Sequence, residues 1–360
     1  EILTPADYRP RHAQYKADPD LQAAHRQHPW ITVWDDHEST NNSRRDSADN
    51  HTEGEEGVWA IRKAWAQQAY DEWMPIRLPE PGNPDRIWRR FRFGQLMDLW
   101  MLDTRLYDRD DELGINDPAS FAADRKLIGP VQRDWLLSGL TDSTTTWKLV
   151  GQQVMFGQLK ATPLPDLGIP IPALAELPIP LFASGEGLTD IYANPDQWDG
   201  YQAERRAIFD HLSAQDIDNF VVLTGDIHSS WVMDLTRDPE NLLQYNPLTG
   251  AGSLGVEYVA TSVTSSGFDQ LAGAPRLANA LRLLNPHMQY VEVTRRGYLL
   301  LDITAAETVG EYWYVSTITE SGGSEAFATG YATAAGARHI TRLPRRTPTA
   351  PREGAPPLAP

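Results

Sequence analysis

The chain has 360 residues, and with 41 % hydrophobic and 22 % charged residues it has the composition of a soluble globular protein, long enough for one large domain or two ordinary ones. Its formal net charge of −17 should repel phosphate backbones, so we expect no nucleic-acid binding through a basic face, although a metal ion or a local arginine can still attract a small anion. The absence of cysteine excludes disulfides, thiolate nucleophiles and cysteine-ligated zinc, and no apolar run approaches the roughly 18 residues of a membrane span.

The N-terminal part of the chain predicts helical stretches around one short strand. Residues 1–28 are polar and helical in pattern, with a helix-start signal at Asp18-Pro19. Residues 31–34 form a short apolar run, which predicts a buried strand. Apolar side chains then recur at helical spacing over residues 58–74, so a helix is expected there.

The middle of the chain predicts three strands and a long insertion. Residues 87–93 alternate apolar with basic side chains, which indicates a half-buried strand, and a turn separates it from a mostly apolar strand at 96–102. A third strand is predicted at 147–155. The Pro-rich stretch at 163–182 predicts an irregular insertion, which is either a lid or wall of a substrate pocket or a plain surface excursion.

The C-terminal half predicts one helix and a series of strands. The helix is expected at 200–212, and residues 220–224 form a buried apolar strand. Further strands are predicted near 256–262, 288–293, 298–303 and 311–317. The tail at 341–360 is rich in Pro, Arg and Thr, so we expect it to be disordered.

Two of the predicted buried strands end in a carboxylate–histidine cluster, Asp35-Asp36-His37-Glu38 after the first and Gly225-Asp226-Ile227-His228 after the second. Sites in layered α/β proteins lie at strand ends, and oxygen and imidazole ligands suit a bound metal. Side chains alternate along a strand, so Asp226 and His228, two apart, can face the same side, with Ile227 between them facing the core. Either cluster alone could be a helix cap or a solvated loop. The pair favours a metal-dependent hydrolase, in which the clusters meet within about 10 Å because a two-metal site spans roughly 4 Å.

A series of motifs follows one another along the chain, and the nine-residue segment Trp34–Asn42 (WDDHESTNN) comes first. The others are Phe93–Leu99, Leu102–Arg105, Gly151–Met155, Asp196–Tyr201, Val222–Trp231, Tyr258–Gly267, Asn285–His287 and Arg296–Tyr298. In content and order they resemble the PhoD-like phosphatases, a family of the calcineurin-like metallophosphatases. The resemblance covers nearly the whole chain to about residue 317, and the first motif together with Gly-Asp-x-His is highly specific.

The resemblance implies an α/β fold, a four-layer αββα sandwich of the metallophosphatase type that is incomplete here at its N-terminus. It also implies a centre of two or three metal ions, with Fe³⁺ and Ca²⁺ in the known type. Matched residue by residue, Asp36, Asp226 and His228 become metal ligands. Asn41 and Asn42 become either calcium ligands or caps of the loop.

The same matching implies which residues handle substrate. His37 and Asp36 become the catalytic pair, with His37 in contact with the phosphate or the leaving group. Arg105 and Arg62 become phosphate-binding residues, although an arginine such as Arg62 on an amphipathic helix could be merely solvated. His287 either approaches the site or belongs to a structural turn. Because no phosphoenzyme is required, the serines of the 258–267 motif are expected to be structural: Ser262, Ser265 and Ser266.

The chain departs from the family at its front. The family carries an earlier strand end with aspartate and a Gly-Asp-x-x-Tyr motif, which supply the bridging aspartate and the tyrosine ligand of the ferric ion, and this sequence has neither. We therefore interpret residues 1–340 as a PhoD-like metallophosphatase domain that lacks its front part, and residues 341–360 as its tail. We expect the upstream sequence to encode the missing motifs and an export signal of the twin-arginine type, which would place the protein in the periplasm, the cell envelope or outside the cell.

The predicted function is the hydrolysis of a small phosphoester by a metal-bound hydroxide, as in an alkaline phosphatase, with phosphodiesterase or phospholipase D-like activity left open. We expect a monomer, and we expect this chain by itself to be inactive because half of the metal ligands are missing. Two alternatives remain: a non-catalytic protein that binds a phosphate polymer or cell-wall polymer through an incomplete metal site, and a domain that calcium only stabilises.

Overall fold

The computed structural model describes residues 1–343 except 115–116, 162–190, 193 and 271–272. The predicted insertion at 163–182 and most of the predicted tail therefore lie outside the described residues. The tail's first residues, Thr341–Leu343, form the short strand β13. Among the described residues, no helix is long and apolar enough to cross a membrane.

The main sheet has seven strands in the order β1-β2-β3-β6-β8-β7-β9. Its strands are β1 (Arg89–Phe93), β2 (Met97–Met101), β3 (Trp147–Gln152), β6 (Phe220–Thr224), β7 (Ser230–Leu235), β8 (Gly255–Val259) and β9 (Met288–Glu292). The four strands β2, β3, β6 and β8 pair in parallel, whereas β1, β7 and β9 run antiparallel to their neighbours. The parallel strands therefore end together at one edge of the sheet, the edge on which sites form in such folds.

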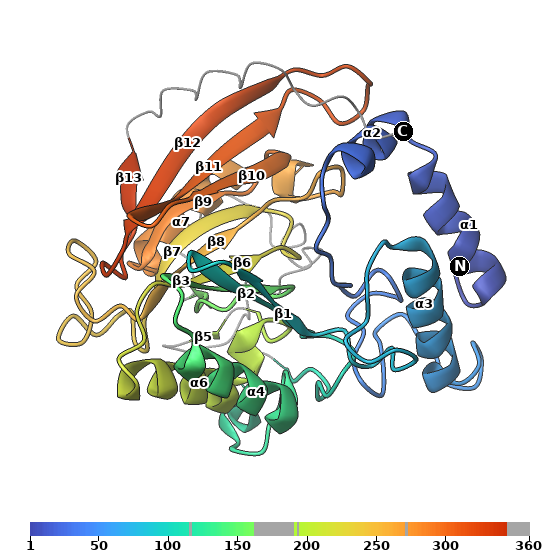
Figure 1. The fold of residues 1–360 in the computed structure, drawn as a ribbon, viewed down its shortest axis with the longest axis horizontal. Helices are drawn as coiled ribbons and strands as arrows, with labels where there is room; N and C mark the ends of the chain where they lie inside the picture. The colour runs from blue at the N-terminus through green and yellow to red at the C-terminus, as the bar shows by residue number, and fades with distance from the viewer. Residues whose placement is uncertain (115–116, 162–190, 193, 271–272, 344–360) are drawn as a thin grey trace.

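One face of this sheet is covered by helices. These are α4 (Gly129–Asp142), α6 (Gln202–Ala214) and α7 (Ala274–Leu284), and Figure 1 shows α4 and α6 side by side against the sheet. Leu136, Phe209 and Leu281 from the three helices share one buried core with Val150 and Val222 of the sheet. The apolar face of each helix is thus buried against the pleated surface.

A second sheet packs on the opposite face (Figure 1). It is antiparallel and consists of β10 (Gly297–Ile303), β11 (Glu307–Val315), β12 (Glu325–Ala334) and β13. Leu149 and Val221 of the main sheet, each next in sequence to a residue of the helix-side core, pack here with Tyr312 and Tyr331. Because side chains alternate along a strand, β3 and β6 are buried on both faces, which explains the continuous apolar run of β6.

The three N-terminal helices lie beside the sheets (Figure 1): α1 (Pro5–Lys16), α2 (Pro19–Gln27) and α3 (Trp59–Trp73). The helix start predicted at Asp18-Pro19 is confirmed, since the Asp18 side chain accepts a hydrogen bond from the Leu21 amide at 2.8 Å. Helix α1 packs against α3 through Tyr8. The smaller elements are the 3₁₀ helices η1 (Pro118–Phe121), η2 (Trp198–Gly200) and η3 (Phe268–Gln270), and the strand pair β4 (Lys160–Ala161) and β5 (Ile191–Tyr192).

Most predicted elements are confirmed, with ends shifted by a few residues, but residues 31–34 form no strand. Strand pairing is replaced there by side chains: Arg89 donates to the Thr32 carbonyl at 2.6 Å, and Gln153 donates to the Trp34 carbonyl at 2.6 Å. The prediction missed α4, α7, β7 and β12. The predicted four-layer sandwich also requires a layer of helices outside β10–β13. Among the described residues no helix packs extensively on those strands, so this fourth layer stays a prediction.

Candidate functional site

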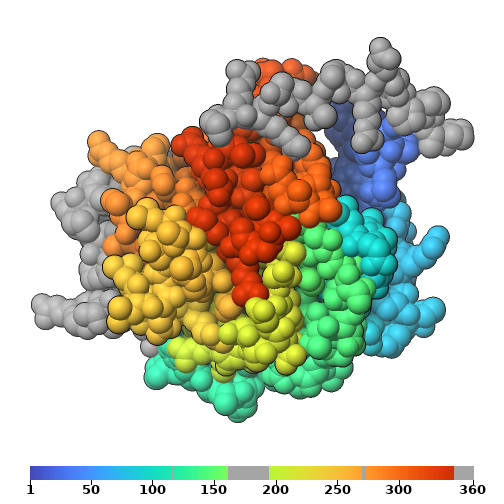
Figure 2. Space-filling model, turned by 60° about the vertical axis from the view of Figure 1, so that its left-hand side comes forward, coloured from blue at the N-terminus to red at the C-terminus, as the bar shows by residue number. Residues whose placement is uncertain are grey.

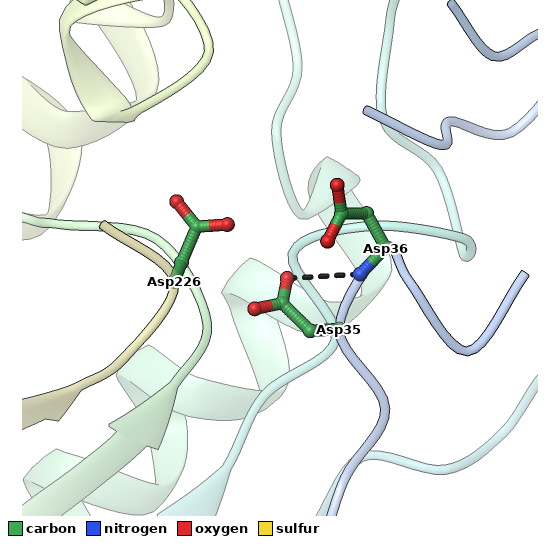
Figure 3. A group of neighbouring side chains, drawn as sticks. All are labelled: Asp35, Asp36 and Asp226. Atoms are coloured by element: carbon green, nitrogen blue, oxygen red, sulfur yellow. Dashed lines mark hydrogen bonds between the residues drawn. The ribbon is translucent and has the colours of Figure 1, made fainter. Parts of the chain in front are cut away.

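Three aspartates from two distant segments meet beyond the end of β6. Asp35, Asp36 and Asp226 each offer one carboxylate oxygen, and these oxygens all lie within 4.8 Å of one another. Figure 3 shows Asp226 facing the Asp35–Asp36 pair across the site. The prediction that the two carboxylate–histidine clusters meet in space is therefore confirmed.

Asp226 reaches the site from a turn that follows β6 directly. The backbone is left-handed at both Asp226 (φ 63°) and His228 (φ 53°), a conformation that costs free energy for residues other than glycine. The expectation that these two side chains share a face because a strand continues through them is therefore wrong, since β6 ends at Thr224. Ile227 between them is buried in the helix-side core, as predicted.

Asp36 organises the loop that carries the other carboxylates. It is 4 % exposed, and its carboxylate accepts hydrogen bonds from the backbone amides of His37 at 2.8 Å and Asn42 at 2.7 Å. The neighbouring Asp35 accepts from the Asp36 amide at 3.0 Å, and its own amide donates to Glu38 at 2.7 Å. These bonds orient both carboxylates without the help of a sheet.

Arg105 is the positive centre of the site. Its side chain is fully buried, and it donates to Asp35 at 2.8 Å, to Asp196 at 2.8 Å and to Asp226. The residue predicted to bind phosphate thus lies at the site, but its guanidinium is paired with three carboxylates. Although burial opposes its charge, Asp196 and Asp226 hold the pKa of Arg105 above its ordinary value.

The carboxylates of the site carry more negative charge than Arg105 balances. Burial raises the pKa of Asp35 and of Asp226, and neighbouring carboxylates add to this effect. Asp196 is different, because Arg105 and Arg109 overcome its burial and lower its pKa. A bound cation would relieve the repulsion among Asp35, Asp36 and Asp226, and carboxylate oxygens are the donors that hard cations such as Ca²⁺ prefer. The donor set therefore fits a metal ion.

The two histidines predicted at the site make different contacts. His37 is mostly exposed, with its Nε2 3.8 Å from the Asp36 carboxylate. His228 donates from Nδ1 to the Ser266 carbonyl at 2.7 Å, since a carbonyl can only accept. In the neutral imidazole this bond leaves Nε2 with its lone pair, which is the tautomer of a metal-binding histidine.

Three other residues predicted for the site form hydrogen bonds with other parts of the protein. Arg62 is 3 % exposed and donates to the Asn50 carbonyl at 2.9 Å, so it is neither solvated nor in contact with the three aspartates. Asn42 caps the loop, because its side-chain amide donates to Asp49 at 2.8 Å. His287 is buried and its Nε2 contacts the Gln158 carbonyl at 2.9 Å, which matches the structural alternative. Burial lowers the pKa of His287 to about 3.

Asn41 and the serines of the 258–267 motif make hydrogen bonds that hold loops and turns. The Asn41 carbonyl accepts from the Asp49 amide at 3.2 Å, so this bond ties the loop together without engaging the side chain. Ser262 donates to the Ser265 carbonyl at 2.9 Å within its own turn, and the Ser266 carbonyl holds His228. The ligand and substrate roles of all these residues stay predictions.

Sequence reasoning missed the glutamines that hold the site together. The Gln153 side chain donates to the Trp34 carbonyl and to the Leu102 carbonyl at 3.1 Å, and it accepts from the Thr104 amide at 3.0 Å and hydroxyl at 2.6 Å. Gln197 donates to the Asp226 carboxylate. Both glutamines lie within motifs that resemble those of the family. The residue type alone does not indicate that an amide side chain supports a site.

Comparisons with known proteins identify the family of this chain. The family model described as "PhoD-like phosphatase" matches residues 1–312. The chain is 35 % identical over 331 residues to alkaline phosphatase D of Bacillus subtilis (strain 168), an alignment that covers 89 % of this chain and 50 % of that protein. The solved "Structure of PhoD" superposes with a TM-score of 0.78 at 32 % identity, covering 96 % of this chain and 61 % of that one. The chain thus spans about half the length of the curated relative.

Proposed function

Because the chain belongs to the PhoD-like phosphatase family, we propose that it contributes metal ligands and substrate-binding residues to the active site of a metal-dependent phosphoester hydrolase. The observation that carries the proposal is the convergence of Asp35, Asp36 and Asp226 within 4.8 Å, from segments about two hundred residues apart. A structural role alone does not explain why three partly or fully buried carboxylates share one space, because their mutual repulsion costs folding free energy.

We assign Asp36, Asp226 and His228 as metal ligands, with Asp35 added to the predicted set. The oxygen-rich donors suit Ca²⁺ and Fe³⁺, the ions that the family resemblance implies. Asn41 and Asn42 remain candidates, and Asn42 would have to exchange its bond to Asp49 for a ligand role. Bound metal ions would supply a hydroxide near neutral pH and positive charge for the phosphoryl oxygens.

The chain's own residues would then bind and orient the substrate. Arg105, which donates to Asp35 and Asp226, would share these carboxylates with a bound cation, and its N–H groups could then donate to phosphoryl oxygens in the bidentate manner that arginine favours. His37, exposed beside Asp36, can donate a proton to the leaving oxygen. Arg62 is a weaker candidate, because its bonds hold α3 to the loop around Asn50.

The experiment compares Asp226→Asn and His228→Ala with Asp134→Asn, a matched control whose carboxylate is exposed on α4. We expect the first two variants to lose bound metal and hydrolysis of p-nitrophenyl phosphate together, by a hundredfold or more, on the order of what a lost ligand costs. Bis-p-nitrophenyl phosphate serves as the diester arm. Because the activity of the complete protein is at issue, the assay uses the full-length polypeptide, with this chain alone in parallel.

The result also separates the alternatives. Wild-type turnover in either variant would remove these residues from the metal centre. Metal and phosphate binding without turnover in the full-length protein would instead support a non-catalytic binder of phosphate polymers, and a loss of stability alone would support a calcium-stabilised domain. We further propose that the complete protein is a secreted monomer with a four-layer sandwich, as the resemblance implies; cell fractionation and size-exclusion chromatography test the first two points.

A further inference from the structure

A cavity lies at the side of the molecule where the edges of the two sheets approach each other. Its volume is about 270 Å³, and it is lined by Arg282 of α7, Gln289 and Tyr290 of β9, Tyr331 of β12 and Arg342 of β13. Strand β9 is the last strand of the main sheet, three places from β6, and β13 is the last strand of the second sheet. Figure 2 shows β12 and β13, in red, at the surface on this side. The cavity is therefore separate from the aspartate site beyond β6.

Two arginines give this cavity an unbalanced positive charge. Arg282 and Arg342 are both exposed, and neither makes an ion pair with any residue in the described part of the chain. Burial raises the pKa of the Tyr331 hydroxyl, whereas the charges of Arg342 and Arg282 act in the opposite direction, so both guanidinium groups lie near that hydroxyl. In a chain with a net charge of −17, two uncompensated cations beside one cavity favour an anionic ligand.

Two tyrosine rings line the cavity. The rings of Tyr290 and Tyr331 lie 5.7 Å apart at 38°, and the Tyr290 hydroxyl contacts the Tyr314 hydroxyl at 3.0 Å. The Tyr331 hydroxyl has a long bond of 3.5 Å to the Gln289 carbonyl, which a better acceptor can replace. The cavity thus offers apolar ring faces together with hydroxyl and guanidinium donors, the combination found in sites for small organic anions.

We propose that this cavity binds a small organic phosphate, with its phosphate group held by Arg282 and Arg342 and its organic part against Tyr290 and Tyr331. A phosphate monoester carries close to two negative charges above neutral pH, which matches two guanidinium groups better than a carboxylate does. The volume of about 270 Å³ is several times the roughly 30 Å³ of a water molecule, so it has room for more than an inorganic ion. This proposal does not depend on the proposed function.

The test is calorimetric titration with phenylphosphonate, a phosphate analogue that phosphatases cannot hydrolyse, above neutral pH. We expect Arg282→Gln and Arg342→Gln each to weaken binding roughly tenfold, the loss expected of one charge-assisted hydrogen bond. The matched control is Arg276→Gln, which removes the same charge from an exposed position on the same helix outside the cavity, and should bind as the wild type does. The difference between variant and control reports on this cavity alone, because any binding at the aspartate site is common to all.

Two comparison ligands sharpen the assignment. Benzoate has the ring and a single charge, and inorganic phosphate has the charge without the ring, so both should bind to the cavity more weakly than phenylphosphonate. Equal affinity for benzoate and phenylphosphonate would overturn the assignment to phosphate. Wild-type affinity for phenylphosphonate in both Arg282→Gln and Arg342→Gln would overturn the site itself, as would a wild-type protein that shows no binding.

Discussion

The two segments that bring carboxylates to the candidate site are held in different ways. The segment with Asp226 leaves a strand that is hydrogen-bonded on both sides within the main sheet. The segment with Asp35 and Asp36 follows no strand, and its approach to the site depends on side-chain bonds from Arg89 and Gln153. One half of the site is therefore positioned by the backbone of the sheet, and the other half by a few side chains.

This difference predicts where single substitutions should act. Substitution of the supporting side chains should increase the mobility of the Asp35–Asp36 half of the site. The position of the Asp226 half should depend mainly on the core beneath the sheet. Three predictions separate the halves, in order of decreasing effect.

The largest effect is expected from Gln153→Leu. This change removes the partner of the Trp34 and Leu102 carbonyls and of Thr104, all in the buried interior. Each unsatisfied buried group costs about 1 kcal/mol or more, so we expect the free energy of unfolding to fall by about 3 kcal/mol. Urea denaturation measures this change, and metal affinity should fall as well.

The control is Gln68→Leu, because the Gln68 amide donates to Glu72 on the exposed side of α3. The free energy of unfolding of this variant should stay within about 0.5 kcal/mol of the wild type. Unchanged metal affinity in Gln153→Leu would show that the loop does not need this support.

In the sheet that carries the Asp226 half of the site, the free energy of unfolding should depend on pH through Glu257. This fully buried residue of β8 accepts from the Thr224 hydroxyl at the end of β6 at 2.6 Å, and burial raises its pKa to about 7. Between about pH 5 and pH 7 the native state holds a proton that the unfolded chain has released, so stability should fall as the pH rises, by on the order of 2–3 kcal/mol. Glu257→Gln should remove the share of this slope that comes from Glu257, as measured by urea denaturation across that range, and leave the share of other carboxyl groups with a raised pKa, such as Glu112. The exposed Glu307→Gln serves as the control, and an unchanged slope in Glu257→Gln would contradict the prediction.

The smallest effect is expected from Arg89→Gln. The Arg89 guanidinium donates to the Thr32 carbonyl at 2.6 Å and to the Ile87 carbonyl at 2.8 Å, so it helps to hold the chain before Asp35. We expect a loss of about 1 kcal/mol and faster amide hydrogen exchange in the loop after residue 34 than in the turn after β6. Arg92→Gln on the same strand, where the side chain is exposed, should change neither. Equal acceleration in both segments would contradict the distinction between the two halves.

Much of this fold could be predicted from the chain, because burial on both faces leaves continuous apolar runs and burial on one face leaves alternation. The apolar run of β6 follows this rule. In β1 arginine and phenylalanine alternate along the sequence, but burial falls along the strand and Phe93 is exposed. Helices α4 and α7 escaped prediction, although α7 carries four buried residues on one face. β7 begins two residues after His228, where the motif for the site and the start of a strand overlap.

The sequence by itself determined the family, the apolar strands and the two acidic clusters, because these depend on residue types that lie next to one another. Tertiary structure alone decided that Asp35 joins Asp36 and Asp226, that Arg105 is paired with their carboxylates, and that Gln153 holds the loop without a strand. It also decided that Arg282 and Arg342, 60 positions apart in the numbering, line one cavity. These relations are distances between residues far apart in the chain, and such distances are set by the packing of the sheets and helices.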